Sequence, residues 1–296
     1  MNLNKISFVT LAISAALCFS AVFAQSAELN SANRQRTRLT IQKEASSGHM
    51  VITWNGKGVL KKASSVNGHF KPVRHGDGQY IVQPDENVAM FRLEGTSPQD
   101  ETNLFSLNVV GYVNVRCPPG LSLIANPLKY ELTNDVIGHL WTVAPDGLQA
   151  FKYGANENYE VSTFDGLSQT WSNPEMDIST GIGFYVQNPT SLTITQTFVG
   201  EVLQGVLVNP LPEGFSTKGA LVPQAGSINS VHLIPSEPGD QLSIYINNLQ
   251  GGGDYILSTF SGTDNAWMPD LIINPGQGFW IQKQHAQNWV RVFYVN

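Results

Sequence analysis

The fold is decided by a stretch that occurs twice, as Thr180-Gly181-Ile182-Gly183-Phe184-Tyr185-Val186-Gln187 and as Pro275-Gly276-Gln277-Gly278-Phe279-Trp280-Ile281-Gln282. Each version places two glycines, one residue apart, directly before an apolar strand. Because glycine tolerates positive φ and a close backbone approach, the pattern predicts a tight turn or bulge that leads into a buried strand. A phosphate-binding loop needs further glycines or a Lys-Ser/Thr pair before a helix, and neither is present.

The stretch belongs to a longer duplication, in which further blocks return after about 95 residues. These blocks are Ser162-Thr163-Phe164-Asp165-Gly166 with Trp171 and Ser258-Thr259-Phe260-Ser261-Gly262 with Trp267, Pro119-Gly120-Leu121-Ser122 and Glu213-Gly214-Phe215-Ser216, and Gln196-Thr197-Phe198-Val199 and Arg291-Val292-Phe293-Tyr294. The spacing drifts by only two residues, which predicts two tandem copies of one β-rich unit, at 104–200 and 201–296. We expect the Phe and Trp of each Ser-Thr-Phe block to reach one core.

The chain before the duplication also has a β pattern. Short apolar runs with turn residues between them predict a small β-sandwich-like module at 37–94. Within it, Asn55-Gly56 after Met50–Trp54 predicts a hairpin that returns at Val59 and Leu60. A polar linker at 95–103 follows. Helical periodicity is confined to short turns expected at 128–140 and 227–233, so the fold class is all-β.

The N-terminus predicts export. Met1 to Lys5 carries one positive charge, an apolar run follows, and Val22-Phe23-Ala24 fits a signal peptidase site. We therefore expect a signal peptide at 1–24, cleavage after Ala24, a flexible lead-in at 25–36 and a secreted, periplasmic or cell-surface location. The apolar stretch is short for a bilayer, and no second span follows. Removal of the signal peptide leaves Cys117 alone, either as a buried small residue or in an intermolecular disulfide.

The overall charge argues against one class of partner. The net charge is −6, and charged residues make up 14% of the 296 residues. A nucleic-acid surface needs clustered Lys and Arg, so nucleic acid is not an expected partner.

Two blocks, Asn108–Val115 and Pro118–Leu128, resemble a large uncharacterised family of secreted bacterial β-repeat proteins, and so do the stretches Phe198–Gly205, Asn209–Pro212 and Val222–Gly226. The front module is similar to small β modules of exported and surface proteins of such bacteria. The resemblance implies export and β architecture, and it implies no catalytic residues.

The sequence has no pattern of catalytic or metal-binding residues. Its six histidines lie at no chelating spacing, so neither a metal nor another cofactor is expected. Acidic residues gather in the first copy, at Glu157, Glu160, Asp165 and Asp177, and most have no acidic counterpart in the second. Turn formation explains them better than a glycosidase pair. We expect no catalytic residues and no enzymatic activity.

Aromatic residues are the best lead to a binding site, because Trp and Tyr on a sheet face stack on sugar rings. Trp171 and Trp267 occupy equivalent positions and fit a core role. Trp280, which replaces Tyr185, and Trp289 and Trp141, which have no clear counterpart, are the candidate ligand contacts.

The sequence therefore leaves three classes of function open. The first is an exported, non-catalytic structural, adhesive or surface-interaction protein that binds envelope or extracellular polysaccharide or other surface proteins. The second is a dedicated carbohydrate-binding protein, which predicts a coplanar row of exposed aromatic rings. The third is a hydrolase with an unrecognised carboxylate pair, which predicts two buried acids in a cleft.

Overall fold

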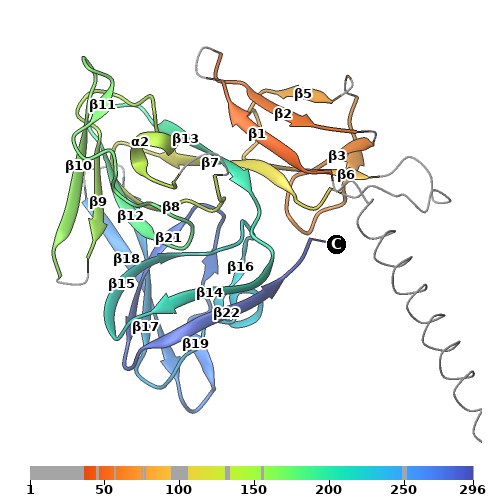
Figure 1. The fold of residues 1–296 in the computed structure, drawn as a ribbon. Coiled ribbons are helices and arrows are strands. Elements are labelled where there is room, and N and C mark those ends of the chain that lie inside the picture. Colours follow the sequence, from red (N-terminus) through yellow and green to blue (C-terminus); the bar gives the residue numbers. More distant parts are fainter. Residues whose placement is uncertain are drawn as a thin grey trace, which may run out of the picture.

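A computed structural model describes residues 37–44, 47–56, 58–74, 76, 78–94, 106–130, 134–154, 157–248 and 252–295. Within these ranges the chain is built almost entirely from antiparallel strands, which confirms the all-β class (Figure 1). The expected signal peptide at 1–24, the lead-in at 25–36 and the linker at 95–103 lie outside the described residues.

The N-terminal part of the chain contributes strands to two sheets. One sheet has the order β1-β2-β5, and the other has the order β13-β7-β6-β3-β4. Their bounds are β1 Leu39–Lys43, β2 Met50–Trp54, β3 Val59–Ala63, β4 Lys71–Pro72, β5 Gln79–Val82, β6 Val88–Glu94, β7 Val110–Cys117 and β13 Ile194–Glu201. The two sheets face each other across a core that includes Trp54, Leu60 and Phe91.

The hairpin expected at Asn55-Gly56 is wrong. β2 pairs with β1 and β5, whereas β3 pairs with β4 and β6 in the opposite sheet. Both strands bury one face in the same core, Trp54 from one side and Leu60 from the other, so the chain crosses between the sheets at this turn. Burial of both apolar faces thus outweighs the local preference of Asn-Gly for a two-residue hairpin.

The second of these sheets runs across the predicted boundary at 95–103. β6 pairs with β7, with Val88 opposite Val113 and Phe91 opposite Val110. The core of the sandwich is also completed from beyond the boundary, by Tyr112 and Val199. The strands of 37–94 therefore share both a sheet and a core with the strands that follow.

The remaining strands form two arrangements, which we call the first unit (β7 to β13) and the second unit (β14 to β22). The further strands of the first unit are β8 Gly120–Ala125, β9 Gln149–Tyr153, β10 Tyr159–Asp165, β11 Thr170–Trp171 and β12 Gly183–Asn188. Those of the second unit are β14 Gly205–Leu211, β15 Gly214–Gly219, β16 Gly226–Ser227, β17 Gln241–Asn248, β18 Gly252–Ser261, β19 Ala266–Met268, β20 Ile272–Ile273, β21 Gly278–Lys283 and β22 Gln287–Phe293.

The two units share one strand order. The first has the sheet β11-β10-β9-β12-β8, and the second has the sheet β19-β18-β17-β21-β15. In each unit the first and last strands also pair, β7 with β13 and β14 with β22. The paired aromatics behave alike too. Phe164 and Trp171 meet edge-on with ring centroids 5.4 Å apart, and Phe260 and Trp267 do so at 5.7 Å.

Among the described residues, each unit has one short helical element. α2 (Ile137–Leu140) lies in the first unit, and the π-helical turn η1 (Ile228–His232) lies in the second. Both fall inside the stretches for which the sequence predicts helical turns. No helix among the described residues is long and apolar enough to cross a membrane.

The two Gly-x-Gly stretches hold the units together. Gly181 and Gly276 have φ of 95° and 79°, which confirms the predicted tight turns before β12 and β21. The contacts are reciprocal. The backbone N–H of Ala125 donates to the carbonyl of Gly276 over 2.9 Å, and that of Gly219 donates to the carbonyl of Gly181 over 3.0 Å. The same turns therefore start a buried strand and bind the neighbouring unit.

Candidate functional site: an aromatic cleft between the two units

The site lies where the outer faces of the two five-stranded sheets meet. Side chains alternate along a strand, so one face of each sheet fills its own unit and the other is free for a neighbour. In β12, Phe184 and Val186 enter the core of the first unit and Tyr185 points outward. In β21, Phe279 and Ile281 enter the core of the second unit, and the half-buried Trp280 is the outward residue.

Strand register adds two tyrosines from each unit. Tyr153 on β9 stands opposite Tyr159 on β10, and Tyr245 on β17 stands opposite Tyr255 on β18. Their ring centroids are 5.5 Å and 5.3 Å apart, respectively. Such facing pairs stabilise antiparallel strands, and here they also build two matching walls. These walls flank what we call the aromatic cleft.

Rings from opposite units interlock inside the aromatic cleft. Trp280 meets Tyr153 edge-on at 4.8 Å, and Tyr185 meets Tyr245 edge-on at 5.6 Å. The indole Nε1 of Trp280 donates to the hydroxyl of Tyr185 over 2.7 Å. The hydroxyls of Tyr185 and Tyr255 lie 2.6 Å apart. The rings are therefore held by both edge-to-face packing and hydrogen bonds, which fixes the shape of the cleft.

The cleft contains two adjoining depressions, which share Tyr255. One of about 390 Å³ is lined by Leu121, Gln149, Phe151, Tyr159, Tyr185, Gln187 and Tyr255. The other, of about 340 Å³, is lined by Tyr153, Phe215, Ser243, Tyr255 and Trp280. Phe215 is 55% exposed and Tyr255 is 51% exposed, so ring surface is open to a ligand. Amide and hydroxyl groups of Gln149, Gln187 and Ser243 supply polar contacts around the rings.

The tyrosines of the cleft are uncharged and can form neutral hydrogen bonds. Burial raises the pKa of Tyr185, and the hydrogen bond with Tyr255 raises it further. Burial also raises the pKa of Tyr159 and of Tyr245. These phenols therefore stay protonated at neutral pH and act as donors and acceptors. Carboxylate, histidine and lysine are missing from the described residues that line both depressions.

Of the three tryptophans that the sequence favours, the structure brings only Trp280 into the cleft. Trp141 is 3% exposed and packs edge-on against Trp171. Trp289 is also 3% exposed, and its Nε1 donates to the carbonyl of His232 over 2.8 Å. Both large apolar rings are buried in the cores of the two units, so neither can make the ligand contact that the sequence suggests. The tyrosines of the cleft were missed, although the pairs Tyr153/Tyr245 and Tyr159/Tyr255 recur at outward positions of both units.

Other candidate groups have structural partners. Cys117 is fully buried, and burial raises its pKa to about 12, so the thiol is out of reach of a second chain. Asp165 accepts hydrogen bonds from the backbone N–H groups of Leu167 and Ser168, and Asp177 accepts one from Ser179. Glu160 pairs with Lys152 at 2.5 Å. Turn and ion-pair roles thus account for these carboxylates.

Among the described residues, no group of three His, Cys, Asp or Glu side chains is placed to hold a metal ion. Asp135, a buried acid, lies apart from the aromatic cleft and pairs with Lys129 over 2.9 Å.

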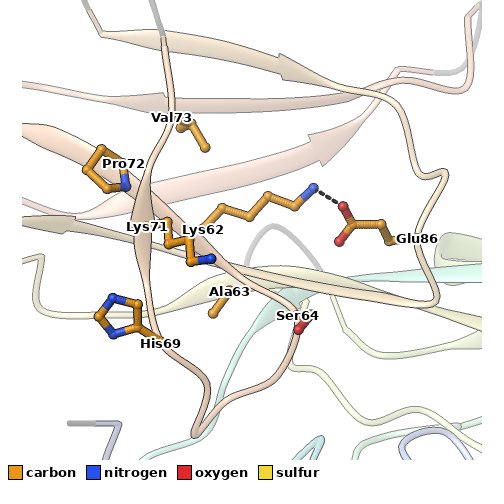
Figure 2. A pocket seen from close by; sticks show the side chains of 8 residues that line it. All are labelled: Lys62, Ala63, Ser64, His69, Lys71, Pro72, Val73 and Glu86. Atoms are coloured by element: carbon orange, nitrogen blue, oxygen red, sulfur yellow. Dashed lines mark hydrogen bonds and ion pairs between the residues drawn. The ribbon is translucent and has the colours of Figure 1, made fainter.

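Another depression, of about 430 Å³, lies outside the aromatic cleft, beside β3 and β4. Figure 2 shows Lys62 reaching toward Glu86, with which it forms an ion pair of 2.6 Å, while His69 lies on the opposite side. The charge of Lys62 is thus neutralised within the depression, and His69 and Lys71 are exposed. Its apolar lining is limited to Ala63, Pro72 and Val73, so it offers no aromatic surface of the kind found in the aromatic cleft.

Comparisons with protein-family models, with curated proteins and with solved structures found no match for this chain. The class of protein is therefore defined by the fold alone, as an all-β protein of paired antiparallel sheets.

Proposed function

We propose that this chain is an exported, non-catalytic binding protein that takes a carbohydrate chain in the aromatic cleft between two duplicated β units. The observation that carries this proposal is the set of interlocked rings from both units, with Trp280 and Tyr255 at its centre. Sugar rings have apolar C–H faces and hydroxyl edges, so they fit a site that offers aromatic surface beside neutral donors and acceptors.

The shape of the cleft favours one form of carbohydrate over another. A flat crystalline polysaccharide fits a row of coplanar rings, but the ring planes here meet at steep angles, such as 69° between Tyr153 and Trp280 and 85° between Phe215 and Trp280. Steeply angled rings form walls and not a platform. We therefore propose a single, soluble oligosaccharide or a loose polysaccharide strand as the ligand.

The lining also favours binding over hydrolysis. A glycosidase needs one carboxyl as acid and a second as base or nucleophile. The described residues that line the cleft are aromatic, aliphatic, amide and hydroxyl side chains. They hold a sugar and supply no group of suitable acidity for cleavage at neutral pH.

The chain's tryptophans provide a direct test. Five of its six tryptophans, at positions 54, 141, 171, 267 and 289, are at most 6% exposed, and Trp280 is half-buried. Acrylamide should therefore quench mainly Trp280 in the purified chain from Gln25 to Asn296. A panel of soluble envelope and plant oligosaccharides should contain at least one that protects Trp280 from quenching in a saturable manner.

Variants then assign the binding to the cleft. Trp280→Ala should weaken binding at least tenfold, about 1.4 kcal/mol, as measured by calorimetry. Tyr255→Phe, which removes one hydroxyl and keeps the ring, should weaken it less. Leu167→Ala is the matched control, because Leu167 is 96% exposed on a turn. Absence of protection by every oligosaccharide, or equal binding by Trp280→Ala and wild type, would reject the proposal.

A further inference from the structure

The two-stranded ribbon of β14 and β22 has an exposed apolar face. Val206 stands opposite Val292 and Val208 stands opposite Val290. These four side chains are 68%, 66%, 49% and 53% exposed, in that order. Tyr294, just beyond β22, is 61% exposed. We call these five residues the valine face. On β14 these valines alternate with the buried Leu207, Asn209 and Leu211, so they point away from the core of the second unit.

The corresponding ribbon of the first unit is covered. On β7 and β13, the side facing away from the core of the first unit carries Tyr112 and Val199, which are 0% and 6% exposed. Both pack into the core closed by β1 and β2. The free edge of β7 is also taken, because β6 pairs with it. This position in the fold therefore accepts a β-sheet as its cover within the same molecule.

In the second unit, β14 pairs only with β22 among the described strands, and no described sheet covers the valine face. The valines there are solvent-exposed on two strands in register, whereas isolated apolar residues are usual on protein surfaces. From typical side-chain areas, the face presents on the order of 500 Å² of apolar surface, at the upper end of patches on monomers. Such a patch marks an interaction surface.

The valine face is suited to packing against a second copy of itself. The residues that point outward from β14 and β22 are Val206, Val208, Pro210, Asn288, Val290 and Val292, and none carries a charge. Two copies of the face can therefore approach without like-charge repulsion, and a two-fold axis places the same residues on both sides.

We propose that a second copy of this chain covers the valine face, so that two β14–β22 ribbons pack face to face as a symmetric dimer. The contact repeats between molecules what β1 and β2 do for β7 and β13 within one molecule. About 500 Å² from each partner is less than the ~800 Å² of a standard interface. The dimer is therefore expected to be weak, with dissociation in the micromolar range, and it forms without any ligand in the aromatic cleft.

Sedimentation velocity on the purified chain from Gln25 to Asn296, at about 1 to 200 µM, tests the proposal. Wild type should shift from monomer to dimer across this range. Val206→Lys and Val206→Glu should each remain monomeric, because the dimer would bury either charge without a partner. Leu167→Lys is the matched control for a charge on an exposed apolar site, and it should dimerise like wild type.

Each other outcome overturns the proposal. A wild type that is monomeric at 200 µM, a dimer that persists in both Val206 variants, or association only with a different protein would each do so. Circular dichroism should show the wild-type β spectrum in the variants. Val292→Glu on the facing strand repeats the test and should give the same loss, so that the result does not depend on one position.

Discussion

One methyl group at Gly278 should weaken the contact between the two units. A Cβ built there would lie 2.7 Å from the carbonyl oxygen of Ile124 and 3.0 Å from its carbonyl carbon. These atoms belong to the backbone, which cannot rotate away, and the neighbouring N–H···O hydrogen bond from Ala125 to Gly276, of 2.9 Å, holds the two segments together. The methyl group must therefore push two sheets apart by at least about half an ångström.

Overpacking of this kind costs about 1–3 kcal/mol. We expect Gly278→Ala to lower the free energy of unfolding by about 2 kcal/mol, a large share of the ~5–15 kcal/mol typical of domains. Urea unfolding followed by circular dichroism measures the change. The matched control is Gly76→Ala, because a Cβ at Gly76 meets nothing within 4 Å. The reasoning is refuted if the two variants unfold at the same midpoint.

The reciprocal contact allows a second measurement. A Cβ at Gly183 would lie 2.7 Å from the carbonyl oxygen of Lys218. Gly183→Ala should therefore cost about as much as Gly278→Ala, about 2 kcal/mol. The double variant should cost less than the sum, because the first methyl group already separates the units.

Three further outcomes are expected. Burial lowers the pKa of His232 from 6.5 to about 4. The resulting contribution to the free energy of unfolding, about 3 kcal/mol, is fully present above pH 6.5 and is lost as the pH falls through 4. His232→Leu should therefore show a flatter dependence of stability on pH between 7 and 4 in urea unfolding. The native chain should leave Cys117 unlabelled by a thiol reagent until urea unfolds it, and labelling at the native rate of a free thiol would contradict its burial. Lys283→Met should cost about 3–5 kcal/mol in urea unfolding, because it strands the buried carboxylate of Asp240, and adding Asp240→Asn should recover part of the loss.

Strand positions and core aromatics were predictable from sequence because both follow from local alternation. Phe164 and Trp171 are 1% and 4% exposed in one unit, as their place in the Ser-Thr-Phe block suggests, and Trp267 is 1% exposed in the other. The two glycines before β12 and β21 were also predicted to turn the chain. Their second role, close contact with the neighbouring unit, depends on how the units pack, which no local pattern encodes.

Strand pairing and the site were harder to predict. Asn55-Gly56 favours a hairpin locally, but the shared core of Trp54 and Leu60 sends β3 to the opposite sheet. The cleft arises only when Tyr153 of one unit meets Trp280 of the other, 127 positions later in the chain. The lack of a counterpart in the other unit marked Trp141 and Trp289 as candidate ligand contacts, but both are buried. The recurrence of tyrosines at outward strand positions of both units was the pattern that indicated the cleft.

The sheet that joins β6 to β7 constrains the order in which the polypeptide gains structure. The core around Trp54 stays open until Val199 has been made, because that side chain and β13 close one side of it. A chain that emerges with its N-terminus first must therefore expose the apolar sides of β1, β2 and β3 while more than one hundred further residues follow. Such delayed, long-range closure slows folding and leaves apolar strand surface open to aggregation during that interval.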